Sequence, residues 1–263
     1  MKRSSRLTSL LALAALAAVA GCSKSTSTVT PTANLSQTDS DDIAQQVGAD
    51  VAGQSNAAVG ASSARPSFSS PQGASAQAVL GDTTFTAGGI TWTLSRTWYD
   101  AGGNAQAGYN PVTTVRMIAS ARGTGAVSGT SFSASFGGYG LLDVNGVAAA
   151  QDTLLTQATH ADTLQSAFTS LSGVSRQFYC QQSSNWVDVR QLKPVSSNPW
   201  PLSGTATFQV DADRLRSSNR GDVEAHLAAT VVVTFNGTRY PTVSVDGKYR
   251  YQLDLMTGAV AHA

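Results

Sequence analysis

The fold class is decided by the stretch "VEAHLAATVVVTFNGTRYPTVSVDGKYRYQLDL", residues 223–255. Apolar and polar side chains alternate along it, as expected for strands that are buried on one face. The alternation is interrupted at Asn236-Gly237 and Asp246-Gly247, and both dipeptides favour tight hairpin turns. The apolar face of the last run consists of Tyr249, Tyr251, Leu253 and Leu255. This stretch therefore predicts consecutive antiparallel strands, a β-meander.

The same two-residue period extends toward the N-terminus as far as residue 90. In "GITWTLSRTW" (89–98), Ile90, Trp92 and Leu94 lie in phase, and the following "DAGGN" (100–104) predicts a hairpin loop. Similar runs occur at 115–121 and 130–136. "QFYCQQ" and "WVDVRQL" predict a further hairpin with its turn at 183–185. We therefore expect a mainly β fold, an antiparallel meander sheet or partly open barrel with one or two short helices, over residues 79–263.

One segment inside this domain departs from the alternation. In "DTLLTQATHADTLQSAFTSL" (152–171), apolar residues recur at intervals of three and four, which predicts a helix that covers one face of the sheet. The alternative is two strands with a turn near His160.

A second helix is predicted before the sheet, over residues 39–53. Ile43, Val47 and Val51 form an apolar stripe, Asp39 or Ser40 can cap the first turn, and Gly53 can end the helix. A helix of this length is marginal alone, so we expect it to dock on the main domain or, alternatively, on a partner protein. The Ser/Ala/Gly/Pro-rich residues 54–78 that follow are typical of a linker.

The first 21 residues have the composition of a secretory signal. Lys2, Arg3 and Arg6 precede an uncharged apolar stretch, 7–20, that is too short for a comfortable membrane span. Removing residues 1–21 changes the formal charge from +1 to about −2, because three positive charges are lost. A chain of this charge offers no basic surface for nucleic acid, so no nucleic-acid partner is expected.

The end of this segment, Val19-Ala20-Gly21-Cys22, resembles the lipobox of bacterial lipoproteins. The resemblance implies cleavage before Cys22 and fatty acylation (palmitate-type chains) of that cysteine, which would anchor the protein to a membrane of the cell envelope. Ser23 in place of an aspartate favours the outer membrane in a Gram-negative organism. The polar residues 22–38 are then predicted to form a flexible tether.

Few residues suggest chemistry. Cys180 lies in phase with Phe178 and is expected to be buried. His226 shares a strand face with Asp222 and Glu224, an arrangement that favours a solvated polar face over a metal site.

His160 lies near Asp162, Asp211 and Asp213 are paired in sequence, and His262 stands alone, but no hydrolase or phosphate-binding motif accompanies them. We therefore predict no catalytic residue, metal or cofactor.

Trp200, in the proline-flanked "SNPWPLSG", is the best candidate for an exposed contact residue, whereas Trp92 is expected in the core. The sequence favours a non-catalytic envelope protein that serves structure or interaction. The alternatives are a carrier of an apolar small molecule or lipid in a concave sheet, and a hydrolase-type enzyme whose site is not recognisable.

Overall fold

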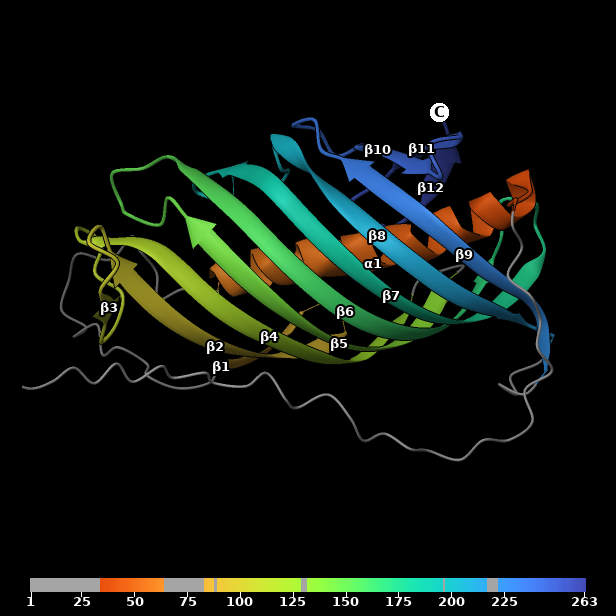
Figure 1. Ribbon diagram of the computed structural model, residues 1–263, viewed down its shortest axis with the longest axis horizontal. Coiled ribbons are helices and arrows are strands. Elements are labelled where there is room, and N and C mark those ends of the chain that lie inside the picture. The colour runs from red at the N-terminus through yellow and green to blue at the C-terminus, as the bar shows by residue number, and fades with distance from the viewer. Residues whose placement is uncertain (1–33, 64–82, 88, 129–131, 196, 217–221) are drawn as a thin grey trace, which may run out of the picture.

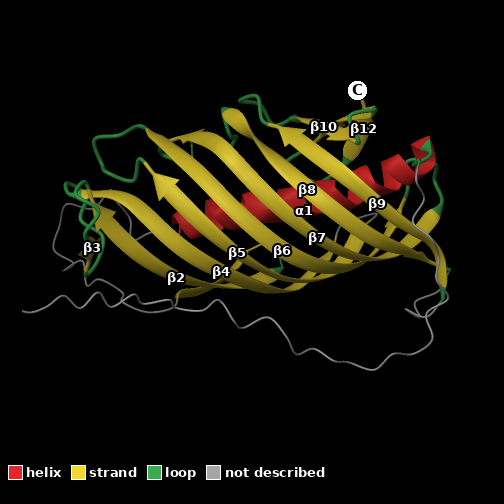
Figure 2. Cartoon of the chain, in the orientation of Figure 1, coloured by secondary structure: helices red, strands yellow, loops and turns green. Residues whose placement is uncertain are grey.

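The computed structural model describes residues 34–63, 83–87, 89–128, 132–195, 197–216 and 222–263. Within these residues, one helix, α1 (Gln37–Ser63), precedes twelve strands that belong to a single antiparallel sheet (Figures 1 and 2). The strands are β1 (Thr83–Ala87), β2 (Ile90–Asp100), β3 (Ala105–Gln106), β4 (Thr114–Ser128), β5 (Phe132–Asn145), β6 (Thr153–Thr169), β7 (Ser175–Leu192), β8 (Ser203–Leu215), β9 (Val223–Thr234), β10 (Thr242–Val245), β11 (Tyr249–Leu253) and β12 (Val260–His262).

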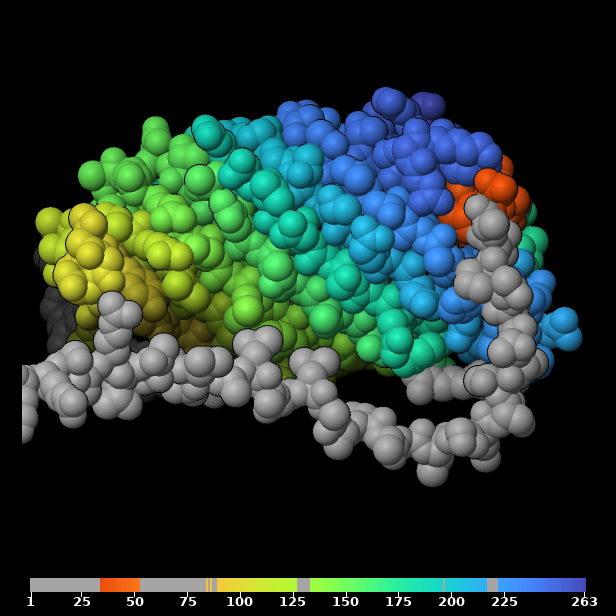
Figure 3. Space-filling model, viewed as in Figure 1, coloured from red at the N-terminus to blue at the C-terminus, as the bar shows by residue number. Residues whose placement is uncertain are grey.

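The sheet is a meander that curves around α1. Its spatial order is β1-β2-β4-β5-β6-β7-β8-β9-β10-β11-β12, and β3 pairs only with β2. Figure 1 shows the long strands sweeping past α1, which lies along the concave side of the sheet. In the space-filling view α1 emerges at one end of the molecule and is covered by strands elsewhere on this face (Figure 3). The predicted fold class, a mainly β antiparallel meander sheet, is confirmed, and the sheet is open.

Two of the predicted hairpin turns have the expected backbone. Asp246 and Gly247 lie in the three-residue connection from β10 to β11 and have φ angles of 50° and 67°, the left-handed geometry that favours an Asp-Gly turn. After β2, the Asp100 carboxylate accepts hydrogen bonds from the backbone N–H groups of Gly102 (2.9 Å) and Asn104 (2.8 Å). The Asn236-Gly237 dipeptide lies in a longer loop between β9 and β10.

Two predictions in the middle of the chain are wrong. Residues 153–169 form neither a helix nor two strands, because β6 is one strand of 17 residues that passes straight through His160. The turn predicted at 183–185 is also absent, since β7 continues as an 18-residue strand from Ser175 to Leu192. The only helix that covers a sheet face among the described residues is α1.

Helix α1 begins earlier and ends later than predicted. Its cap is Ser36, whose hydroxyl accepts a hydrogen bond from the Asp39 backbone N–H (3.2 Å) while the Asp39 carboxylate accepts one from the Ser36 N–H (3.2 Å). This reciprocal capping box replaces the predicted cap at Asp39 or Ser40. The helix also continues past Gly53 to Ser63. No helix in the described part of the chain is long and apolar enough to cross a membrane.

The core lies between α1 and the concave face of the sheet. The predicted helix stripe is fully buried there, with Ile43 at 1% exposure and Val47 and Val51 at 0%. The sheet contributes alternate residues of each long strand, including Trp92, Phe178, Cys180, Phe208, Leu227, Val231, Tyr251 and Leu253. The buried positions predicted for Trp92 and Cys180 are therefore confirmed. Helix α1 and the β11–β12 connection come into close contact at Gly48, where an added Cβ would lie 2.8 Å from the carbonyl oxygen of Gly258.

Candidate functional site

Three loops meet where β7, β9 and β11 end. They connect β7 to β8 (193–202), β9 to β10 (235–241) and β11 to β12 (254–259). The backbone N–H of Gly237 donates to the carbonyl of Pro201 (2.9 Å), and that of Leu255 donates to the carbonyl of Arg239 (3.0 Å). These bonds tie the middle loop to both of its neighbours. The three loops therefore form one continuous surface.

A bidentate ion pair fixes the second and third loops. Nε of Arg239 donates to Oδ1 of Asp254 (2.5 Å), and Nη2 donates to Oδ2. The same carboxylate accepts a hydrogen bond from the backbone N–H of Met256 (2.9 Å). The hydrogen bonds from Arg239 lower the pKa of Asp254 to about 2, so the pair is charged at neutral pH.

These loops expose large apolar side chains. Leu202 is 39% exposed, Tyr240 is 47% exposed and Met256 is 60% exposed. Trp200 is half-buried and packs against the main core. We call Trp200, Leu202, Tyr240 and Met256 the Trp200 patch. Trp, Tyr and Met are enriched at protein-binding surfaces, where the aromatic rings supply contact area at low conformational cost.

Sequence reasoning identified only one member of this patch. The flanking prolines indicated a loop at Trp200, and the structure confirms the loop but places the indole partly in the core. Leu202, Tyr240 and Met256 were missed. Their convergence depends on the Arg239–Asp254 pair and on loop-to-loop hydrogen bonds, and no local sequence pattern reveals those contacts.

The concave interior contains a second group of polar residues, beneath α1. Oδ2 of Asp42 accepts a hydrogen bond from Nε of Arg176 (3.2 Å), and Gln46 accepts one from the Ser166 hydroxyl. Burial raises the pKa of Asp42 to about 6, although Arg176 and Arg214 oppose this shift. Because both partners of each pair lie between helix and sheet, these contacts hold α1 in place.

His160 and Asp162 also point into this interior, on the inner face of β6. Burial lowers the pKa of His160 to about 4, and its ring lies edge-on to Trp186 with centroids 5.9 Å apart. Asp162 is buried, and so is Ser184, which pairs with His160 across the strands. These groups lie inside the packed interior, so they do not form an open cleft for a substrate.

The polar group around His226 differs in composition from the predicted one. Its Nδ1 lies 2.8 Å from Asp213 Oδ1 and its Nε2 lies 3.4 Å from Asp211 Oδ1, both on the neighbouring strand β8. Glu224, predicted to share a face with His226, lies two residues before it on β9 and 3.5 Å from Nε of Arg214. Within the described residues, no three His, Cys, Asp or Glu side chains are placed to hold a metal ion.

His262 does not stand alone in the structure. Its Nε2 lies 3.5 Å from Oδ2 of Asp41 in α1, and its ring lies beside that of Tyr251. The C-terminal strand β12 is thus joined to the first turns of the helix.

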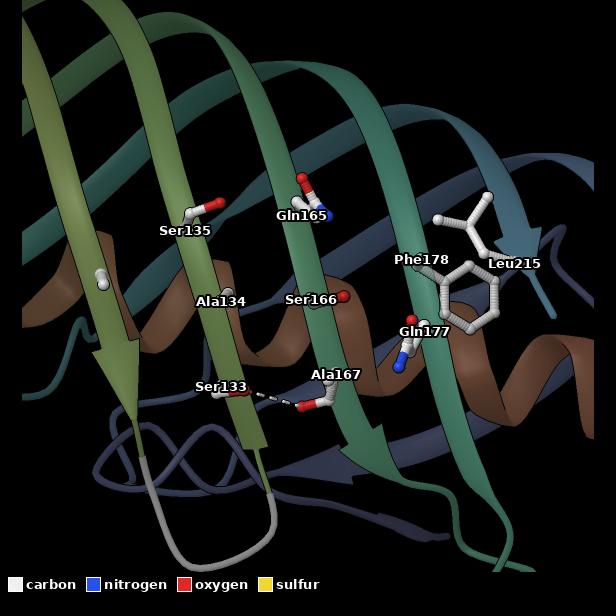
Figure 4. Close-up of a pocket in the computed structure, with 10 residues that line it drawn as sticks. Ser133, Ala134, Ser135, Gln165, Ser166, Ala167, Gln177, Phe178 and Leu215 are labelled. Carbon is white, nitrogen blue, oxygen red and sulfur yellow. Dashed lines mark hydrogen bonds between the residues drawn. The ribbon is translucent and has the colours of Figure 1, made fainter. Parts of the chain in front are cut away.

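A pocket of about 490 Å³ lies over β4 to β8 (Figure 4). Ser135, Gln165 and Gln177 line it, with Leu215 at its edge, and α1 lies behind the strands in this view. None of the described residues that line it is titratable. The pocket therefore provides no acid, base or metal ligand from these residues.

The predicted acylation site, Cys22, lies outside the described residues. No protein-family model, curated protein or solved structure matches this chain.

Proposed function

We propose that this chain is a bacterial envelope lipoprotein, acylated at Cys22 and held at a membrane, in the outer membrane where the organism has one. Its β domain acts without catalysis and binds another envelope protein through the Trp200 patch. The observation that carries the proposal is the combination of a packed interior with exposed apolar side chains on hydrogen-bonded loops. An exposed apolar cluster on a rigid frame favours an interaction site.

The packed interior argues for interaction over the carrier alternative. A carrier needs open apolar volume for its ligand. Here the concave face is filled by side chains of α1, among them Ile43, Val47 and Val51. A ligand in that space would have to displace the helix and its polar contacts with Arg176, Ser166 and Gln182. The buried positions of Asp162 and Ser184 argue in the same way against a hydrolase site.

Anchoring is tested by growing a bacterial host on an alkyne-tagged fatty acid. The wild-type protein is expected to carry the tag and to sediment with membranes. The Cys22→Ser variant is expected to lose the tag and to become soluble. A Cys180→Ser variant is the matched control and should keep both properties, because Cys180 is fully buried in the folded domain. An untagged wild-type protein would refute the anchoring proposal.

Partner binding is tested with a photo-crosslinking amino acid at Tyr240 in living cells. The control position is Tyr139, which has similar exposure (44%) but lies on β5. One defined adduct is expected from Tyr240, absent from Tyr139 and lost when Met256→Asp is added. Equal adducts from both positions would contradict a role for the patch. A bound small molecule found by native mass spectrometry and lost on denaturation would favour the carrier instead.

A further inference from the structure

We propose that the end of the sheet where α1 begins faces the membrane, and that the turn between β6 and β7 (170–174) contacts the lipid surface. The inference rests on the proposed anchoring through Cys22. It adds an orientation and a lipid-contacting site that the anchor alone does not specify.

The chain from the anchor joins the domain at a fixed point. Leu35 is buried in the core, and its carbonyl accepts a hydrogen bond from the Tyr249 hydroxyl (3.0 Å). The first turn of α1 is then held by an ion pair between Asp39 Oδ1 and Nη1 of Arg214 (2.7 Å), near the end of β8. The anchor chain is therefore attached to the domain at this end of the sheet.

The β6–β7 turn lies at the same end. Arg176, two residues after the turn, forms an ion pair with Asp42 in the second turn of α1 (3.2 Å). The turn itself is closed by hydrogen bonds from the Ser170 N–H to the Val174 carbonyl and from the Gly173 N–H to the Ser170 carbonyl, both 2.9 Å. Gly173 has a φ of 79°, which suits glycine at this position.

The chemistry of this turn suits a lipid surface. Leu171 is 40% exposed and Val174 is 45% exposed, although neither side chain takes part in the hydrogen bonds that close the turn. Residues 169–175, "TSLSGVS", contain no charged side chain, so no ionised group has to be desolvated on contact. Exposed aliphatic side chains gain free energy at the boundary between headgroups and acyl chains.

The anchor chain is short. Twelve residues lie between Cys22 and Leu35, which allows a span of at most about 45 Å between them. The membrane surface is therefore close to the point where the chain joins the domain, and the β6–β7 turn lies at that end of the sheet. The loops of the Trp200 patch lie at the opposite ends of β8 and β9.

The test uses the acylated full-length protein in liposomes that contain lipids with a doxyl quencher. A fluorophore is attached at Ser172→Cys in the turn, or at Ser197→Cys in the β7–β8 loop as control. Both positions are exposed, whereas Cys180 is fully buried and Cys22 is acylated, so labelling is selective. We expect severalfold quenching at position 172 and no change at position 197.

The outcomes separate this inference from the proposed anchoring. A protein that fails to float with liposomes would overturn the anchoring, and this inference with it. Flotation with equal quenching at both positions would overturn the orientation alone. Leu171→Asp combined with Val174→Asp should abolish most quenching at position 172, whereas Val112→Asp, at an 82% exposed residue before β4, should not. Persistent quenching in the double variant would overturn the contact by the turn.

Discussion

Nε2 of Gln182 donates a hydrogen bond of 2.6 Å to Oδ2 of Asp50, which joins β7 to α1 inside the protein. Both side chains are buried, at 5% and 4% exposure. Asp50 follows Gln46 and Asp42 at intervals of four residues, and each of the three bonds to the sheet. This polar stripe lies one residue before the apolar stripe of Ile43, Val47 and Val51. The helix is therefore positioned by hydrogen bonds as well as by apolar packing.

Removing the donor of this bond should loosen the helix. Gln182→Leu is expected to lower the free energy of unfolding by about 1–3 kcal/mol, because a buried carboxylate loses a hydrogen bond. Adding Asp50→Leu should restore part of the loss, since the buried charge is then removed as well. Urea denaturation of Gln182→Leu, Asp50→Leu, the double variant and the wild type measures both effects. If the losses in the free energy of unfolding caused by Gln182→Leu and Asp50→Leu simply add in the double variant, the two residues are not coupled.

The same polar contacts explain which parts of the fold could be predicted. The strands at 90–100 and 249–253 were recognisable because their buried faces are apolar, with Trp92, Leu94, Tyr251 and Leu253 in phase. On β6 the inner face includes Asp162 and Ser166, and these polar residues interrupt the two-residue apolar period. The remaining apolar residues recur at intervals of three and four, which is typical of a helix.

The prediction for β7 failed for the same reason. Gln182 and Ser184 point inward, and "SSN" therefore looked like a turn. Gln182 is buried because the helix supplies its partner, Asp50, from 132 residues away, whereas the Ser184 hydroxyl accepts a hydrogen bond from Nε1 of Trp186 on the same strand. Pairing between residues so far apart arises only in the folded chain, and no local sequence pattern predicts it. The members of the Trp200 patch converge through contacts of the same long-range kind.

The close approach of α1 to the C-terminal strands should make Gly48 intolerant of larger residues. In Gly48→Ala the new methyl carbon would lie 2.8 Å from the Gly258 carbonyl oxygen and 2.9 Å from Cγ1 of Val260. We expect a loss of about 1–3 kcal/mol in the free energy of unfolding from overpacking. Gly137→Ala is the matched control, because an added Cβ there meets no atom within 4 Å. Equal melting temperatures for the two variants would contradict the tight contact.

Burial of His160 should make the protein less stable in mild acid. Its folded pKa of about 4 lies below the ordinary value of 6.5, so its contribution is complete above pH 6.5 and is lost as the pH falls toward 4. For this pKa shift, the full loss in the free energy of unfolding is about 3 kcal/mol. Asp42 opposes it, because its folded pKa is raised to about 6 and protonation favours the fold as the pH falls from 6 to 4.

The difference between wild type and His160→Gln isolates the histidine, since Asp42 is common to both. We expect the stability of the variant relative to the wild type to rise steadily from pH 7 to pH 4.5 in urea titrations. A difference that does not change with pH would mean that His160 is protonated equally well in the folded and unfolded chains.

The ion pair of Arg239 and Asp254 should determine the order of the Trp200 patch. Asp254→Asn removes the charge that accepts both guanidinium bonds, so the amides of residues 235–240 and 254–258 should exchange with solvent faster. Asp143→Asn is the control, because Asp143 forms a similar two-bonded pair with Arg116 between strands β4 and β5. Faster amide exchange in Asp143→Asn should be confined to β4 and β5.

The pH dependence of the same exchange supplies a second check on this ion pair. Because the folded pKa of Asp254 is about 2, below its ordinary 3.8, the contribution of the pair is complete above pH 3.8 and is lost as the pH falls through 2. Protection of the two loops should therefore persist at pH 4. Loop protection that is already lost at pH 4 in an otherwise folded protein would show that other contacts, such as the bond from Gly237 to Pro201, limit the order of the patch.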